Sequence, residues 1–137
     1  MFSLISDIRN CNFLEFGVKE GRSTAKFLEI CKKNNGKLLS IDINDYSNLF
    51  ESEHWKFLKT RDDNFELVDE HIKEDLDVIY LDSLHEASHV EKIFYHYYPK
   101  LKINGYFFID DISWLPYTKS SSRNNFYCEI NNKETFQ

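Results

Sequence analysis

The chain has 137 residues, of which 42% are hydrophobic and 29% charged, a composition typical of one soluble globular domain. Its net charge of −6, without any run of lysine or arginine, argues against broad binding to nucleic acid, because an acidic surface repels phosphates. No signal peptide is evident, and no apolar run approaches the ~20 residues that a membrane span needs. The three cysteines, Cys11, Cys31 and Cys128, form no C-x-x-C pair, which favours reduced, mostly buried thiols in a cytoplasmic protein.

The chain begins with an amphipathic lead-in of one or two helical turns over residues 1–11, followed by the first predicted strand, 12–18. Apolar residues follow one another in that strand almost without interruption, which is typical of a strand buried on both faces of a parallel sheet. A turn with two glycines then opens a helix, for which Ser23 is the predicted N-cap and Asn35-Gly36 the predicted end.

Strands and helices continue to alternate through the rest of the core. We predict strands where short apolar runs end in turn residues, and helices where apolar residues recur at helical spacing. The predicted strands are 37–43, 55–60, 76–81 and 106–109, and the predicted helices are 65–72 and 87–98. Residues 46–54 form either a short helix or a loop. Residues 113–137 are a polar C-terminal extension without a further strand–helix unit.

This alternation predicts an α/β fold, with βαβ units, right-handed crossovers and a mostly parallel sheet of about five strands covered by helices on both faces. We interpret residues 1–137 as a single domain whose core spans about 12–112. In such sheets the ligand lies beyond the carboxyl ends of the strands. Polar residues are placed to form a site at four of these ends, namely 17–23, Asp42, 82–85 and 110–111.

The glycine turn differs from the G-x-G-x-x-G fingerprint of dinucleotide-binding proteins. Its glycines, Gly17 and Gly21, lie four residues apart, and Glu15 lies at the end of the strand before them. A carboxylate at this place would repel a pyrophosphate but suits a cationic ligand. The alternative is a tight turn that binds no ligand.

Asp42 closes the second predicted strand, about 25 residues after the first glycine of the turn. This spacing suits an acidic residue that accepts hydrogen bonds from ribose hydroxyls. An isolated acid at a strand end is equally compatible with a solvated turn residue.

Carboxylates and one histidine follow the last two predicted strands. Because adjacent strand ends bring them together, they would repel one another unless a hard divalent cation such as Mg²⁺, Ca²⁺ or Mn²⁺ were bound. The alternative is a solvated acidic rim. His89 and His96 lie seven residues apart on one predicted helix and are expected at its surface or boundary, not as ligands. This cluster consists of His85 and the candidate metal ligands Asp82, Asp110 and Asp111.

These residues, in this order, resemble the class I S-adenosylmethionine-dependent methyltransferases, and in particular their small-molecule O-methyltransferase branch. The first motif of that branch, E-x-G-x-x-x-G-x-S-T, stands here as E-F-G-V-K-E-G-R-S-T. The later motifs stand as D-V-I-Y-L-D-S-L-H and L-K-I-N-G-Y-F-F-I-D-D, and the resemblance covers about residues 12–112. It implies a Rossmann-like three-layer sandwich with strand order 3-2-1-4-5. The chain would lack the C-terminal antiparallel strands of the family, which would leave the fifth strand as an unprotected edge.

The resemblance also implies a role for each strand end. The turn would hold the methionine part of S-adenosylmethionine, Asp42 its ribose, and Asp62 or Asp63 its adenine. In metal-dependent members that modify sugars, the acids after strands four and five bind Mg²⁺, here Asp82, Asp110 and Asp111. His85 would be the general base, with Asp82 beside it as the second catalytic residue. The residues implied to bind the cofactor are Glu15, Gly17, Val18, Gly21, Ser23, Asp42, Asp62 and Asp63.

The predicted function is therefore O-methylation of a hydroxylated small molecule or sugar, with or without Mg²⁺. The alternative is a truncated, inactive cofactor-binding or interaction domain, completed by a partner chain or by a second copy of itself. The missing G-x-G-x-x-G argues against a nicotinamide-dependent dehydrogenase. A phosphoacceptor receiver domain would need an acidic pair after strand one, where Gly17 stands. A base-modifying methyltransferase is disfavoured by charge and by Asp82-Ser83-Leu84-His85 in place of an N/D-P-P-Y motif.

Overall fold

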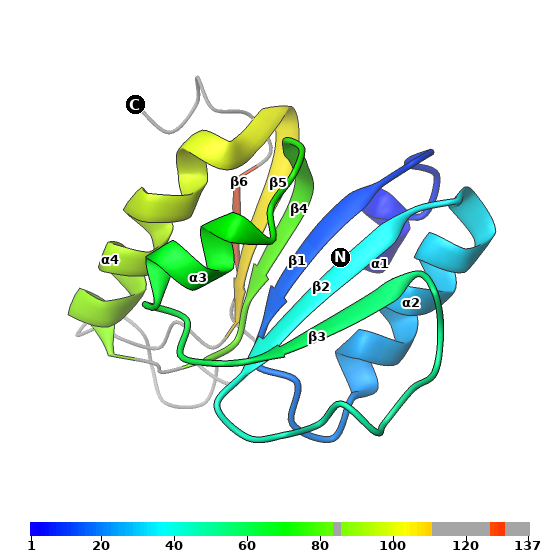
Figure 1. Cartoon of the computed structure of the whole chain (residues 1–137). Coiled ribbons are helices and arrows are strands. Elements are labelled where there is room, and N and C mark those ends of the chain that lie inside the picture. The colour runs from blue at the N-terminus through cyan, green and yellow to red at the C-terminus, as the bar shows by residue number, and fades with distance from the viewer. Residues whose placement is uncertain (84–85, 111–126, 131–137) are drawn as a thin grey trace, which may run out of the picture.

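The structure, a computed structural model, describes residues 1–83, 86–110 and 127–130, the last of these as backbone only. Five parallel strands and one antiparallel strand form a single sheet in the order β3-β2-β1-β4-β5-β6 (Figure 1). The parallel part has the predicted order 3-2-1-4-5. The strands are β1 (Asn12–Phe16), β2 (Lys37–Asp42), β3 (Trp55–Lys59), β4 (Leu76–Leu81), β5 (Leu101–Asp110) and β6 (Tyr127–Ile130).

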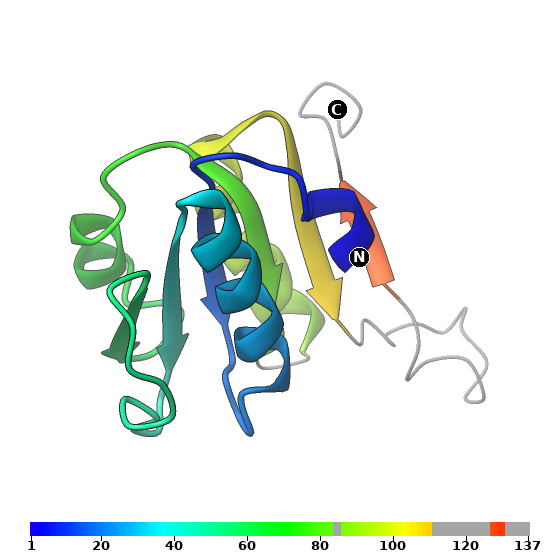
Figure 2. The same ribbon diagram turned by 90° about the vertical axis from the view of Figure 1, so that its right-hand side faces the viewer.

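Helices cover both faces of the sheet, as the alternation of elements predicts. Figures 1 and 2 show α1 and α2 on one face, and α3 and α4 on the other. The lead-in contributes one helical turn, as expected. In the part of the chain that the structure describes, no helix is long and apolar enough to cross a membrane. The helices are α1 (Phe2–Ile5), α2 (Arg22–Asn34), α3 (Phe65–Glu70), α4 (Ala87–Tyr97) and the 3₁₀ turn η1 (Tyr98–Lys100).

Two hydrophobic clusters lie on opposite sides of the sheet. Because side chains alternate along a strand, Leu14 and Phe16 of β1 pack in the cluster that contains α4, whereas Phe13 packs in the cluster that contains α2. Cys11 and Cys31 belong to the α2 cluster as buried free thiols with their Sγ atoms 3.8 Å apart, as predicted. The side chain of Cys128 lies outside the described residues.

The edge of β5 differs from the prediction. The sequence predicts that β5 has no neighbour on its outer side, but β6 pairs with it antiparallel, with Phe107 opposite Ile130 and Asp110 opposite Tyr127. The chain therefore does have an antiparallel strand after β5. Pairing supplies main-chain partners along the C-terminal part of β5, which would otherwise be open to association with other strands.

The start of β5 also differs from the prediction. The Asn104-Gly105 pair indicates a turn before a strand over 106–109, but β5 already begins at Leu101. The pairing register with β4 shifts between Leu76 and Val78, and Asn104 adopts a φ of +71°. These residues thus form a bulge inside a long strand, and Asn104 suits it because asparagine tolerates the left-handed backbone conformation.

Candidate functional site

A cavity of about 390 Å³ opens at the carboxyl ends of the parallel strands. Its lining includes Gly17 after β1, Asp42 at the end of β2, Asp62 after β3 and Asp82 after β4. The structure thus brings together one candidate residue from each of four strand ends. Crevices at this edge are where open α/β sheets bind their ligands, and the volume lies in the range of small-molecule sites.

Gly17 allows the ends of β1 and β4 to approach each other closely. Its N–H donates to the carbonyl of Ile41 at 2.8 Å, and the N–H of Asp82 donates to the carbonyl of Phe16 at 2.8 Å. A Cβ at position 17 would lie 1.9 Å from the carbonyl oxygen of Asp82, and φ is +93°. Only glycine fits this position, so the strand ends can flank one narrow cavity.

The rest of the turn leads into α2. The N–H of Gly21 donates to the carbonyl of Val18 at 2.9 Å, and both Lys19 and Gly21 adopt positive φ. Gly21 is the N-cap of α2, so the prediction of Ser23 as N-cap is wrong. The hydroxyl of Ser23 binds Glu15 instead, because a buried carboxylate needs donors.

Glu15 lies beneath the turn and is completely buried. Its carboxylate accepts hydrogen bonds from the hydroxyls of Ser23 at 2.6 Å, Thr24 at 2.6 Å and Ser40 at 2.8 Å. The indole N–H of Trp55 donates to the same Ser40 oxygen at 2.9 Å. Burial raises the pKa of Glu15, against the effect of the three hydroxyls. The side chains of Glu15 and Ser23 therefore join β1, β2 and α2 and do not line the 390 Å³ cavity, where the sequence places them.

Asp42 holds the turn from the side of β2. Its Oδ2 accepts the backbone N–H of Val18 at 2.8 Å and that of Lys19 at 3.4 Å, and its Oδ1 accepts the N–H of Asn44 at 3.0 Å. Oδ1 keeps acceptor capacity, because each carboxylate oxygen offers about two lone-pair sites and only Oδ2 already accepts two N–H groups. Next to it, the apolar side chain of Ile43 lines the cavity with 62% of its surface exposed.

The acids after β3 have different surroundings. Asp62 is buried and lines the cavity, whereas Asp63 does not. Asp63 accepts two bonds from Arg61, at 2.8 and 3.0 Å, and one from Lys92 at 3.4 Å. The hydrogen bonds from Arg61 hold the pKa of Asp63 well below its usual range. Of the two acids, only Asp62 is placed to contact a ligand in the cavity.

Two residues of the cavity lining, Ser83 and His89, are missed by the sequence analysis. His89 lies at the boundary of its helix, as predicted, with its side chain 10% exposed, but it also lines the cavity and its Nε2 lies 2.8 Å from Oδ1 of Asp62. Ser83 donates to Asp62 Oδ2 at 2.5 Å. His96 also lies at the boundary, where it binds Asp69. No local signal marks His89, because its partner lies 27 residues earlier in the chain.

The candidate metal ligands are partly described. The Asp82 side chain is 15% exposed, and both its oxygens lie 3.4 Å from the ammonium of Lys19. Asp110 accepts a hydrogen bond from the hydroxyl of Tyr80 at 3.2 Å. Pairing of Leu81 with Ile109 puts the two acids directly after adjacent residues of β4 and β5. His85 and Asp111 lie outside the described residues.

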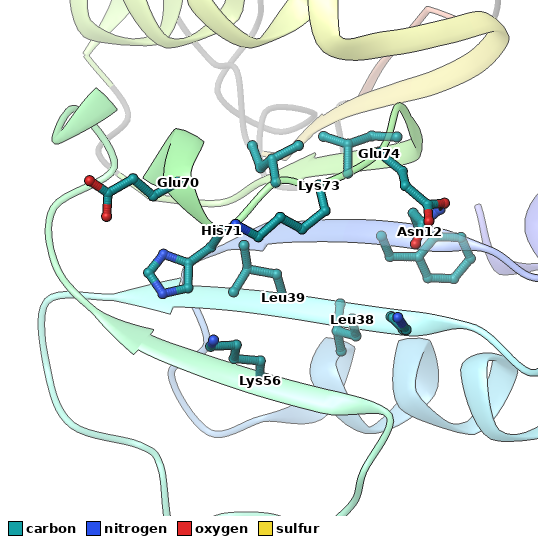
Figure 3. A pocket seen from close by; sticks show the side chains of 12 residues that line it. Asn12, Leu38, Leu39, Lys56, Glu70, His71, Lys73 and Glu74 are labelled. Atoms are coloured by element: carbon teal, nitrogen blue, oxygen red, sulfur yellow. The ribbon is translucent and has the colours of Figure 1, made fainter. Parts of the chain in front are cut away.

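A larger hollow, of about 650 Å³, lies near the amino ends of the strands, opposite the first cavity. Figure 3 shows Lys73 and Glu74 on one side of it and Lys56 of β3 on the other, with Leu39 between them. It adjoins Asn12 and Leu76, the first residues of β1 and β4. None of the candidate site residues lines this hollow, and strand amino ends are not where α/β sheets carry their sites. We therefore assign the candidate site to the smaller cavity.

Comparison with known proteins agrees with this fold. A family described as a methyltransferase domain matches residues 14–112, which include the end of β1, all of β2 to β5 and every described candidate residue. The chain belongs to this methyltransferase family. The resemblance seen in the sequence motifs is thereby confirmed. No curated protein matches the chain significantly.

Solved structures of methyltransferases have the same fold. The MycE methyltransferase of the mycinamycin biosynthetic pathway, in complex with Mg and SAH, is 22% identical over 80% of this chain, with a TM-score of 0.64. A putative caffeoyl-CoA O-methyltransferase from Staphylococcus aureus is also 22% identical over 80%, with a TM-score of 0.62. The structure cmcI-D160 Mg-SAM is 21% identical over 81%, with a TM-score of 0.58. This methyltransferase domain spans only 30%, 54% and 50% of those three chains, respectively.

Proposed function

We propose that this methyltransferase domain binds S-adenosylmethionine in the 390 Å³ cavity and methylates a hydroxyl oxygen of a small molecule or sugar. One observation carries the proposal: Asp42 and Asp62 lie on the lining of a single cavity at the carboxyl edge of the sheet. Two acids at these strand ends suit a nucleoside, whose ribose hydroxyls and exocyclic amino group are donors. The MycE structure is a complex with SAH and the cmcI structure one with SAM, which supports the same ligand here.

The remaining lining fits the other parts of such a ligand. Ile43 offers an exposed apolar surface beside Asp42, suitable for packing against a purine ring. The glycine turn offers a close approach to main-chain atoms, which suits the amino-acid part of the cofactor. We infer that Glu15 and Ser23 contribute by holding this turn in shape, since their side chains are bonded beneath it.

The strand-end acids fit a divalent cation. Asp82 and Asp110 offer carboxylate oxygens, which Mg²⁺ prefers, and they follow adjacent strands. The Lys19 ammonium at Asp82 would have to move aside, which its 60% exposure permits. Asp82 and Lys19 also line a smaller hollow of about 300 Å³ beside the turn, where an acceptor could approach. Mg²⁺ held by Asp82, Asp110 and Asp111 would bind the acceptor hydroxyl and lower its pKa.

The protein's own contribution is mainly to position the two reactants. The methyl group of S-adenosylmethionine is activated by its sulfonium, so the domain must align the acceptor oxygen with it and remove a proton. Such alignment can supply about 7–11 kcal/mol of the barrier reduction. His85 is the proposed general base, because it follows Asp82 by three residues.

A second candidate function follows from the length of the chain. This function is binding of the cofactor without turnover, since the chain spans only about a third to a half of the methyltransferases it resembles. A methylation assay with hydroxylated acceptors, with and without Mg²⁺, separates this function from the first. Methyl transfer by the purified chain alone would exclude it.

The cofactor assignment is tested by calorimetric titration with S-adenosylhomocysteine. We expect binding by the wild type and roughly 10- to 100-fold weaker binding by Asp42→Ala, since hydrogen bonds to a charged group are lost. Asp45→Ala is the control, because Asp45 is exposed, near Asp42 and absent from the cavity lining. Absence of binding by the folded wild type would refute the proposal.

A further inference from the structure

We infer that His89 and Ser83 are positioning residues that fix the Asp62 carboxylate and thereby make the cavity selective for adenine over hypoxanthine. The inference rests on the proposed function, since it concerns the nucleoside end of the same cavity. It assigns roles to two residues, Ser83 after β4 and His89 on α4, that no sequence motif marks.

Helix α4 holds residue 62 at two points. His89 Nε2 lies 2.8 and 2.9 Å from the two carboxylate oxygens of Asp62. Two helical turns later, the hydroxyl of Tyr97 donates to the main-chain carbonyl of the same residue at 3.0 Å. Both contacts are largely shielded from water, because Tyr97 is fully buried and the side chains of His89 and Asp62 are 10% and 9% exposed.

Ser83 holds the same carboxylate from the end of β4, with its hydroxyl 2.5 Å from Oδ2. Residue 62 is therefore fixed by groups from two segments that are remote in sequence. Rotation of its carboxylate would break the bonds to His89 and Ser83 at little-exposed atoms, where lost hydrogen bonds are costly. An aspartate in a solvated turn would not need hydrogen bonds from two other segments of the chain to hold its carboxylate in place.

The direction of these bonds decides what Asp62 offers to a ligand. A carboxylate that faces two such groups accepts from both, so His89 donates its Nε2–H and Ser83 donates its hydroxyl hydrogen. The Asp62 carboxylate has about four lone-pair sites, and those that do not bind His89 or Ser83 can accept a hydrogen bond from a ligand. Asp62 lines the cavity together with Ser83 and His89. An exocyclic amino group of adenine satisfies such an acceptor. The carbonyl oxygen of hypoxanthine would face it with a second acceptor and be repelled.

A metal ion is the competing occupant of this cluster. Ligand atoms of Asp62, Asp63 and His89 all lie within 4.8 Å of one another, the spacing of a possible cation site. However, Arg61 and Lys92 already bind Asp63, so the protein supplies the positive charge itself. The geometry therefore favours a positioning role over a metal centre.

The test compares the affinities of S-adenosylhomocysteine and its deaminated analogue, S-inosylhomocysteine, by calorimetry. We expect the wild type to prefer the adenine compound roughly 10- to 100-fold, the range for a hydrogen bond to a charged group. His89→Leu should lower this preference at least several-fold, whereas His89→Gln, which keeps an N–H donor, should retain most of it. His96→Gln is the matched control, since His96 lies on the same helix but binds Asp69.

Each outcome of this test either supports or contradicts the inference. An unchanged preference in folded His89→Leu would overturn it while leaving the cofactor assignment intact, and failure of the wild type to bind either compound would overturn both. If His89→Leu does not fold, Ser83→Ala provides the same comparison, with a lowered preference expected. Zn²⁺ or Mn²⁺ binding that is lost in His89→Leu and Asp63→Asn would assign the cluster to a metal and contradict the positioning role.

Discussion

Glu15 is a fully buried carboxyl group, and its burial links the stability of the protein to pH. Because burial raises its pKa above the ordinary value of 4.5, the folded protein holds this proton more tightly than the unfolded chain. The corresponding stabilisation is complete below the unfolded pKa and is lost as pH rises through the folded pKa. Glu15 therefore makes the wild type less stable as pH increases from about 4.5.

Replacing Glu15 with glutamine should remove this dependence, since glutamine has nearly the same shape but does not ionise. We expect the free energy of unfolding of Glu15→Gln, relative to wild type, to rise with pH by up to about 1.4 kcal/mol per pH unit. Urea unfolding between pH 4 and 8 measures it. Glu20→Gln is the control, because the Glu20 side chain is 76% exposed. Parallel curves for wild type and Glu15→Gln would contradict the assignment.

Ile43 tests the packing of the cofactor without disturbing the fold. Its side chain is 62% exposed, so Ile43→Ser should change the free energy of unfolding by about 0.5 kcal/mol or less. The affinity for S-adenosylhomocysteine should fall about 10-fold, because apolar surface is no longer buried by the ligand. Ile103→Ser is the control, with 65% exposure on the early part of β5. Equal affinities in the two variants would remove Ile43 from the site.

The residues of the site differed in how far the sequence could predict them. Gly17 and Asp42 are set by their position at strand ends, so a correct strand assignment was sufficient to place them on the cavity. His89 and Ser83 depend on contacts with Asp62 across more than 20 residues of chain, for which no periodicity exists. Glu15 was placed in the right motif, but sequence alone could not decide whether its carboxylate faces a ligand or the hydroxyls beneath the turn.

At the scale of elements, the junction of β1 with β4 depends on Gly17. Gly17→Ala should destabilise the domain by about 3 kcal/mol or more, because the new methyl group meets main-chain atoms at a strained φ. Gly21→Ala is the matched comparison, since its nearest neighbours are side-chain atoms of Leu49 and Phe50 at 3.2 Å. We expect it to cost about 1–2 kcal/mol. Chemical denaturation measures both, and an equal cost would show that the close approach to Asp82 is not the cause.

The ends of β4 and β5 carry the proposed metal ligands. We expect Asp82→Ala and Asp110→Ala each to abolish Mg²⁺-dependent methylation and to weaken Mn²⁺ binding, while binding of S-adenosylhomocysteine remains detectable. Paramagnetic relaxation of water by Mn²⁺ and calorimetry measure the two ligands separately. Asp77→Ala, at the opposite end of β4, is the control. Equal loss of cofactor affinity in both variants, with Mn²⁺ binding unchanged, would count against the metal assignment.

Boundaries of elements were predicted best where one local signal dominated. β4 has the predicted bounds, 76–81, because an unbroken apolar run is followed by an acid. The start of β5 could not be predicted, since Asn104-Gly105 is a turn signal that the pairing with β4 converts into a bulge. α2 begins at Arg22 because the buried Glu15 engages Ser23, a tertiary effect that overrides the capping preference.

For the whole molecule, alternation of strands and helices was sufficient to predict a parallel sheet between two helical layers. Strand order was not contained in that pattern and followed only from the resemblance to methyltransferases, which the family match confirms. β6 was missed because four residues in a polar extension carry too little periodicity. The position of β6 follows from its antiparallel pairing with β5.

The central claim is that the carboxyl-edge cavity binds S-adenosylmethionine, with Asp42 at the ribose and Asp62 at the adenine. The most direct measurement is a crystal structure of the protein with S-adenosylhomocysteine and Mg²⁺. We predict ribose hydroxyls within hydrogen-bond distance of Asp42 and the adenine amino group within hydrogen-bond distance of Asp62. A nucleoside bound instead in the hollow beside Lys56 and Lys73, or one with its adenine turned away from Asp62, would contradict this account.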